Sequence, residues 1–201
     1  MDPGYTGLGT LAIKLDLSAG DLVVAATYTS DLTGVLTVTD TLALSWTSVA
    51  AVTTAGCAPR LQLWYAPVTA AGSDTVTVSQ TGSTALGMEL VEYSGLATVS
   101  PVDTSVGTVA TVASNVVDPG AIVTTSPDVL VALFADLNGI GTMTAGPGVV
   151  ERGLDSNFYT LYGDDVPGSA AGSHDLTAML PGTTSDACWT ANVVALRIGT
   201  E

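Results

Sequence analysis

Leu11-Ala12-Ile13-Lys14-Leu15-Asp16-Leu17 is the stretch that decides the fold class. Its large apolar side chains fall at every second position, and Lys14 and Asp16 occupy positions between them. Successive side chains of a β-strand point to opposite faces of a sheet, so this stretch predicts a strand covered on one side. The same alternation recurs in 36–39 and 75–79, where leucine or valine alternates with threonine or serine.

Three other stretches, 21–27, 129–135 and 192–198, are more continuously apolar. Such runs predict strands that are covered on both faces. Pro-Gly turn signals separate the strands at five places: 3–4, 119–120, 147–148, 167–168 and 181–182. Proline presets φ for a type II turn, and glycine accepts the positive φ that follows. Short strands between dense turn signals predict an antiparallel sandwich or barrel.

The chain also shows a weak internal duplication, with pseudo-repeats at about 10–95 and 105–199. In each repeat an apolar strand begins after an aspartate, Asp21 in the first and Asp128 in the second. Another strand precedes it, the alternating 11–17 in the first repeat and 121–123 in the second. The segment 96–108 is neither long nor flexible enough to be a linker between two domains. We therefore expect a single domain over 1–201, an antiparallel two-sheet β-sandwich of jelly-roll type built from two Greek-key halves.

The charge balance excludes some partners. The 201 residues carry 4 Lys+Arg against 19 Asp+Glu, a formal net charge of −15. Nucleic-acid binding needs clustered cations that release counterions from phosphates, and anionic membrane surfaces repel an acidic chain. Hydrophobic residues make up 47% of the chain, which excludes disorder. We therefore expect neither a nucleic acid nor a membrane as partner.

The N-terminal Met1-Asp2-Pro3-Gly4 lacks the basic and apolar regions of a secretory signal, and no apolar run reaches the ~18 residues of a membrane helix. The sequence thus predicts a protein that stays where it is made, unless a signal has been removed. Cys57 and Cys188 are its only cysteines. They could form a disulfide, but without an export signal two buried thiols are favoured, and the sequence leaves the pairing open.

A resemblance rests on a series of short pieces that covers nearly the whole chain. These pieces are Gly20-Asp21-Leu22-Val23-Val24, Val38-Thr39-Asp40, Trp46-Thr47, Leu63-Trp64-Tyr65-Ala66-Pro67, Thr75-Val76-Thr77-Val78 and Val91-Glu92-Tyr93-Ser94-Gly95. Together they resemble a β-sandwich module of actinobacterial phage virion proteins and of secreted bacterial surface proteins with lectin-like jelly rolls. The resemblance implies a structural or binding role, and it carries no catalytic residues to transfer.

The residues themselves give weak support for catalysis. His174 is the only histidine, and its neighbour Ser173 points to the other face of a strand, so the two cannot pair there. Glu89 and Glu92 are the best carboxylate pair for glycoside hydrolysis, but a spacing of three places them on opposite faces of an unbroken strand. We therefore expect no enzyme and no catalytic residues, with a glycanase possible only if a bulge brings both glutamates together.

Two binding sites remain as weak candidates. Ca²⁺ binds six to eight oxygen atoms, and the densest local set of oxygen-bearing side chains is Asp155, Asn157, Asp164 and Asp165. Without Ca²⁺ these are solvated turn residues, and no cofactor is expected. Aromatic side chains that stack on sugars or on a neighbouring subunit could form a second site: Trp64, Tyr65, Phe158, Tyr159 and Tyr162. Alternation requires one of Trp64 and Tyr65 to point outward, whereas Trp46 and Trp189 are expected in the core.

The predicted outward positions are mostly threonine, serine, glycine and alanine, which lose little side-chain entropy when a neighbour covers them. The leading expectation is therefore a structural protein of a bacteriophage virion, either a capsid decoration or minor capsid protein or a tail component. It would be assembled in the host cytoplasm, as a homo-oligomer or symmetric assembly, against partners such as the major capsid or tail protein. The alternative is an extracellular carbohydrate-binding or adhesion module, with a glycan as ligand.

Overall fold

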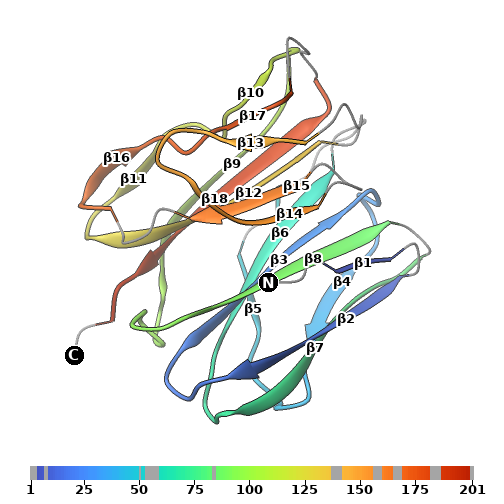
Figure 1. The fold of residues 1–201 in the computed structure, drawn as a ribbon, viewed down its shortest axis with the longest axis vertical. Coiled ribbons are helices and arrows are strands. Elements are labelled where there is room, and N and C mark those ends of the chain that lie inside the picture. Colours follow the sequence, from blue (N-terminus) through green and yellow to red (C-terminus); the bar gives the residue numbers. More distant parts are fainter. Residues whose placement is uncertain are drawn as a thin grey trace.

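The computed structural model describes residues 4–6, 9–49, 51–52, 59–82, 85–136, 142–155, 160–164, 169–181 and 187–199. Every regular element in these ranges is a β-strand, and every strand pair is antiparallel (Figure 1). The prediction of an antiparallel all-β chain is therefore confirmed. Among these residues, no helix is long and apolar enough to cross a membrane.

The N-terminal half forms two sheets. The first inner sheet has the strand order β1 (Gly4–Thr6), β8 (Leu86–Tyr93), β3 (Leu22–Thr29), β6 (Arg60–Pro67) and β5 (Thr47–Ser48). The first outer sheet has the order β2 (Thr10–Leu17), β7 (Gly72–Gln80) and β4 (Leu36–Thr39). Buried side chains of both sheets, such as Ala25 and Val76, belong to one hydrophobic cluster, so the two sheets are stacked.

The C-terminal half repeats this arrangement. The second inner sheet has the order β14 (Val150–Asp155), β15 (Thr160–Asp164), β12 (Asp128–Asp136), β18 (Trp189–Arg197) and β9 (Val102–Val109). The second outer layer consists of two small sheets: β10 (Val116–Val117), β17 (Ala178–Met179) and β13 (Thr144–Ala145) in one, and β11 (Ile122–Thr124) and β16 (Gly172–His174) in the other. Phe134 and Trp189 of the inner sheet pack against this layer.

The two halves have the same strand order. Read from its other edge, the second inner sheet is β9-β18-β12-β15-β14, which corresponds strand by strand to β1-β8-β3-β6-β5. The outer strands also correspond in chain order, except that the partners of β2 and β7 are each interrupted in the second half. Each half is therefore an inner sheet stacked on an outer layer, with the same connectivity.

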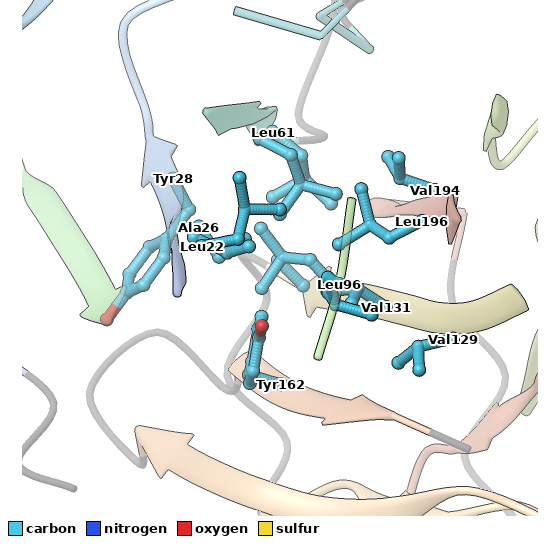
Figure 2. Packing of buried hydrophobic residues seen from close by; sticks show 14 residues of the cluster. Leu22, Ala26, Tyr28, Leu61, Leu96, Val129, Val131, Tyr162, Val194 and Leu196 are labelled. Atoms are coloured by element: carbon cyan, nitrogen blue, oxygen red, sulfur yellow. The ribbon is translucent and has the colours of Figure 1, made fainter. Parts of the chain in front are cut away.

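The inner sheets of the two halves face each other. Leu22, Ala26 and Leu61 of the first inner sheet share a hydrophobic cluster with Val131 and Val194 of the second (Figure 2). The described strands thus form four layers, with the two inner sheets in the middle. The expected two-sheet jelly-roll sandwich is not confirmed, because the strands belong to five separate sheets.

The burial of each strand follows its sequence pattern. In β3 and β12 every side chain is buried, since these strands are covered on both faces, as their continuous apolar runs predicted. In β2 the exposure of side chains alternates, as Leu11 to Leu17 predicted. Glycine follows proline in two described turns with positive φ, at Gly120 (88°) and Gly148 (79°), which is the type II geometry.

Cys188 is buried and disulfide-bonded. The chain's other cysteine, Cys57, lies outside the described residues. The sequence argument that favoured two free thiols was therefore wrong for Cys188. Disulfides persist in oxidising environments and are rare in the reducing cytosol.

Candidate functional site

Polar side chains from three strands meet at one edge of the layer between the inner sheets. Tyr93 comes from β8 of the first inner sheet, Tyr162 and Asp164 from β15, and Arg152 from β14 of the second. We call these four residues the inter-sheet polar cluster. Its members lie up to 71 residues apart in sequence, and the register of β12 with β15 places Tyr162 and Asp164 beside Leu133 and Val131.

The cluster forms a continuous chain of hydrogen bonds across the two sheets. The Tyr162 hydroxyl donates to the Tyr93 hydroxyl oxygen at 3.0 Å, because the Tyr93 proton is already directed to Asp164 Oδ2 at 2.9 Å. Arg152 Nε lies 3.0 Å from both carboxylate oxygens of Asp164. The cluster thus satisfies a carboxylate that is fully buried.

A β-bulge explains why Arg152 reaches Asp164. The pairing of β14 with β15 shifts between Glu151 and Gly153, so Arg152 has no direct partner in the ladder. An extra residue in one strand turns its side chain away from the regular alternation. The Arg152 side chain remains 33% exposed, so the cation lies at the rim while its carboxylate partner lies inside.

Glu89 approaches the cluster from β8. It is buried, and its carboxylate lies over Gly153, where a Cβ atom would come within 2.5 Å of Oε2. Burial, together with nearby negative charge from Asp164 and Glu89, raises the pKa of Tyr162. Burial is also the main cause that raises the pKa of Tyr93, and the hydrogen bond to Asp164 raises that of Arg152. Both phenols therefore stay protonated and remain donors at physiological pH.

This arrangement suits a structural role. Proton transfer needs a group whose pKa lies near the working pH and that substrate can reach, whereas Tyr162 and Asp164 are fully buried and both phenols are held protonated. The cluster connects the two halves of the chain. The sequence argument did not select Tyr93 or Arg152, because nothing local marks residues that meet only through sheet stacking.

The described aromatic residues that were predicted to form a binding surface are buried or half-buried. Trp64 packs into the cluster between the first inner and first outer sheets, where its Nε1 donates to Thr27 Oγ1 at 3.2 Å. Tyr65 packs on the other face, against the second inner sheet. Tyr162 is fully buried and is not on a surface. Trp64 and Tyr65 thus lie on opposite faces of β6, as alternation requires, and each is half-buried against a neighbouring sheet. Phe158 and Tyr159 lie outside the described residues.

The residues proposed for Ca²⁺ are not brought together by what the structure describes. Asp164 is paired with Arg152, and it lies at the opposite end of the β14–β15 pair from Asp155. Asp155 is the last residue of β14, and Asn157 and Asp165 lie outside the described residues. Within the described ranges, no three His, Cys, Asp or Glu side chains are grouped so that they could hold a metal ion.

The two catalytic alternatives depend on side-chain direction. β8 pairs with β3 without a register shift, and Glu89 lies opposite Ala26 while Glu92 lies opposite Val23. Ala26 faces the other half and Val23 faces the first outer sheet, so the two glutamates are on opposite faces, as the spacing predicted. His174 Nε2 lies 2.8 Å from the carbonyl oxygen of Ala170.

The outward face of the first outer sheet is covered with small polar side chains. Alternation leaves ten outward positions on its three strands. They are Thr10, Ala12, Lys14, Asp16, Thr37, Thr39, Ser73, Thr75, Thr77 and Ser79. Only Lys14 and Asp16 are charged, in a chain with 19 acidic residues. This flat face is therefore nearly uncharged.

The opposite outer layer presents larger apolar side chains. Val117 and Ala178 are buried, so their neighbours Val116 and Met179 point outward, and Val123 is 63% exposed. The two outward faces of the molecule thus differ in chemistry. Trp46, expected in the core, is instead half-buried beside a shallow hollow lined by Val38, Thr39, Asp40, Ala43 and Leu44.

Comparisons of the chain with family models, with curated proteins and with solved structures found no match.

Proposed function

We propose that this chain is a non-enzymatic structural protein of a bacteriophage virion, a capsid decoration or minor capsid protein or a tail component. It acts by packing against other proteins of the particle, in several symmetric copies. The proposal also includes the fold relationship: each half is a sandwich unit of the jelly-roll type with Greek-key connections.

The observation that carries the proposal is the outward face of the first outer sheet. Side chains such as Thr37, Thr75 and Thr77 are short, so a neighbour that covers them immobilises few rotamers. Protein interfaces are depleted of Lys, Glu and Asp, and eight of the ten outward positions here carry no charge. A face built in this way suits close contact with another protein over a flat area.

The interior supports a passive role. The ionisable groups that converge in the inter-sheet polar cluster are directed to one another, and their hydrogen bonds join the two halves. A disulfide at Cys188 adds a covalent restraint suited to a particle that persists outside the cell. Both features favour rigidity over turnover.

The test is the composition of purified particles. We expect mass spectrometry of density-purified virions to find this chain at a fixed ratio to the main shell or tail subunit. The ratio should survive washing with high salt. A chain that is absent from the particles, or that is found free in the medium at a variable ratio, overturns the proposal.

The second candidate function is extracellular carbohydrate binding or adhesion, and Trp46 favours it. Its half-buried ring borders a hollow with a volume of about 350 Å³, and its Nε1 donates to Asp40 Oδ2 at 2.8 Å. A ring fixed by such a bond offers a stacking surface for a sugar. Glycan-array binding that Trp46→Ala abolishes and Trp64→Phe preserves would favour this function over the structural one.

A further inference from the structure

β9 is a free edge of the second inner sheet. It is the last strand in the order β14-β15-β12-β18-β9, and within the described residues no strand pairs with its other side. A free edge presents unpaired backbone N–H and C=O groups, to which another strand can add.

The hydrogen-bond alternation identifies the outward groups. Ala110 N donates to the Trp189 carbonyl, and Arg197 N donates to the Pro101 carbonyl, so the odd-numbered residues of β18 bond toward β9. Antiparallel pairs alternate between bonded and non-bonded positions. With Thr190 opposite Val109 in the register, the backbone groups of Ser105, Gly107 and Val109 therefore point away from β18.

A hollow lies on the face of β9 that Ser105 shares with Val194, which is the face turned toward the first half. Ser105, Gly107 and Val109 line it together with Ala51, Val52 and Asn192, and its volume is about 360 Å³. Val52 covers the inner face of Gly107, where a Cβ atom would come within 2.1 Å of its Cγ2. Ser105 and Gly107 are nevertheless exposed, so the edge of β9 is within reach of a second chain.

Other described edges carry features that block strand addition over most of their length, whereas those of β9 lie at one end. β14 has the bulge at Arg152 and the charged Glu151, and β2 exposes Lys14 and Asp16. β4, β5 and the strands of the second outer layer are four residues long or shorter. β9 has eight residues, and its register shift and its one charge both lie at Asp103, which is paired with Arg197 at 2.6 Å. The pairing of 104–109 with β18 is regular. Charges, bulges and short length are the usual protections of an edge.

We propose that the β9 edge binds the β9 edge of a second copy of this chain, so that two second inner sheets join into one continuous sheet. A two-fold axis at Gly107 sets Ser105 of one copy opposite Val109 of the other, and both copies then use the same outward groups. The segment 104–113 has no charged residue, so two chains of charge −15 can approach here without opposing like charges.

This contact rests on the proposed function, since it names one of the interfaces by which copies would assemble. A pairing of about five residues buries less area than the 1,200–2,000 Å² of a standard interface, so we expect a dissociation constant on the order of 0.1 mM. Repeated contacts in a particle would strengthen it by multivalency.

The test uses the full chain in about 0.5 M salt, which screens the net charge. Sedimentation equilibrium should show a reversible dimer. Ser105→Lys, which places a charge at the edge, should abolish the dimer. The matched control Ser30→Lys, with the same change at an exposed position after β3, should dimerise like the unmodified chain.

Amide exchange of the unmodified chain provides an independent readout if a variant folds poorly. Raising the concentration should slow exchange several-fold at Ser105, Gly107 and Val109, and leave Val106 and Thr108, already bonded to β18, unchanged. A dimer that persists in Ser105→Lys, protection without this alternation, or a monomer at millimolar concentration overturns the β9 contact. None of these outcomes bears on whether the chain is present in purified particles. The β9 contact and the proposed virion function can therefore fail separately.

Discussion

The hydroxyl groups of Tyr93 and Tyr162 meet at 3.0 Å although they belong to opposite inner sheets. Together with Asp164 and Arg152 they connect the two halves of the chain through polar bonds inside a mostly apolar layer. Buried polar networks fix one arrangement of their elements, because any displacement leaves a group without its partner. The stability of the layer should therefore depend on these few atoms.

Tyr93→Phe tests this dependence. It removes the donor to Asp164 and the acceptor for Tyr162 with little change in volume. A hydrogen bond to a charged group is worth about 2 kcal/mol, which corresponds to a Tm lowered by roughly 4–8 °C in a chain of this size. Thermal unfolding measures it, and Tyr65→Phe is the matched control on the same apolar layer. Equal effects of the two variants would contradict the role of the Tyr93 hydroxyl.

A double-mutant cycle should show that Arg152 and Asp164 are coupled. Arg152→Met leaves a buried carboxylate without its cation, and we expect a loss of about 2 kcal/mol, between the values for exposed and buried pairs. Adding Asp164→Asn should recover part of that loss. Denaturant unfolding measures the coupling, and the exposed pair Lys14 and Asp16 should show almost none. Additive effects at 152 and 164 would refute the ion pair's contribution.

Asp128 should make stability depend on pH. Burial, and then the neighbouring charge of Asp103, raise its pKa above 3.8, although a hydrogen bond from Ser126 opposes the shift. A raised pKa means that folding favours the protonated form, so this group's contribution is present at low pH and is lost as pH rises through the folded pKa. Asp128→Asn should therefore raise Tm at pH 7 and have less effect near pH 3. Scans from pH 3 to 7 measure this, with exposed Asp16→Asn as control.

Thiol titration tests the disulfide at Cys188. In denaturant we expect no free thiol before reduction and two afterwards, since the chain has two cysteines. Positions 57 and 188 are about 130 residues apart, and closing so long a loop is worth about 4–5 kcal/mol in the chain-entropy model. Reduction should therefore lower the Tm strongly. Free thiols in the untreated protein would contradict the bond.

The strands were predictable because each carries its own pattern. The alternation in 11–17 marked a strand covered on one side, and 129–135 marked one covered on both, which the burial of β2 and β12 confirms. The same continuous apolar runs also indicated more than two layers, which the two-sheet prediction did not consider. Strands covered on both faces need layers on each side, and a two-layer sandwich leaves every sheet with one face in water. A stack of more than two layers follows from this requirement.

The polar cluster was not predictable in the same way. Tyr93, Arg152 and Asp164 lie on three strands, and their meeting depends on how two sheets are stacked and on a bulge at Arg152. Local periodicity assigns a side chain to a face, but it does not say which strand lies across from that face. For the same reason the alternation placed Trp64 and Tyr65 on different faces of one strand but did not show that a sheet lies against each face.

The two halves share one strand order, so a single polypeptide contains the two similar units that a homodimer would assemble from two chains. In a homodimer every substitution is copied onto both poles, so the poles stay alike. Here the two outer faces differ: threonine and serine cover one, while Val116, Val123 and Met179 face away from the other. A molecule with unlike poles can bridge two different neighbours and keep a single orientation between them.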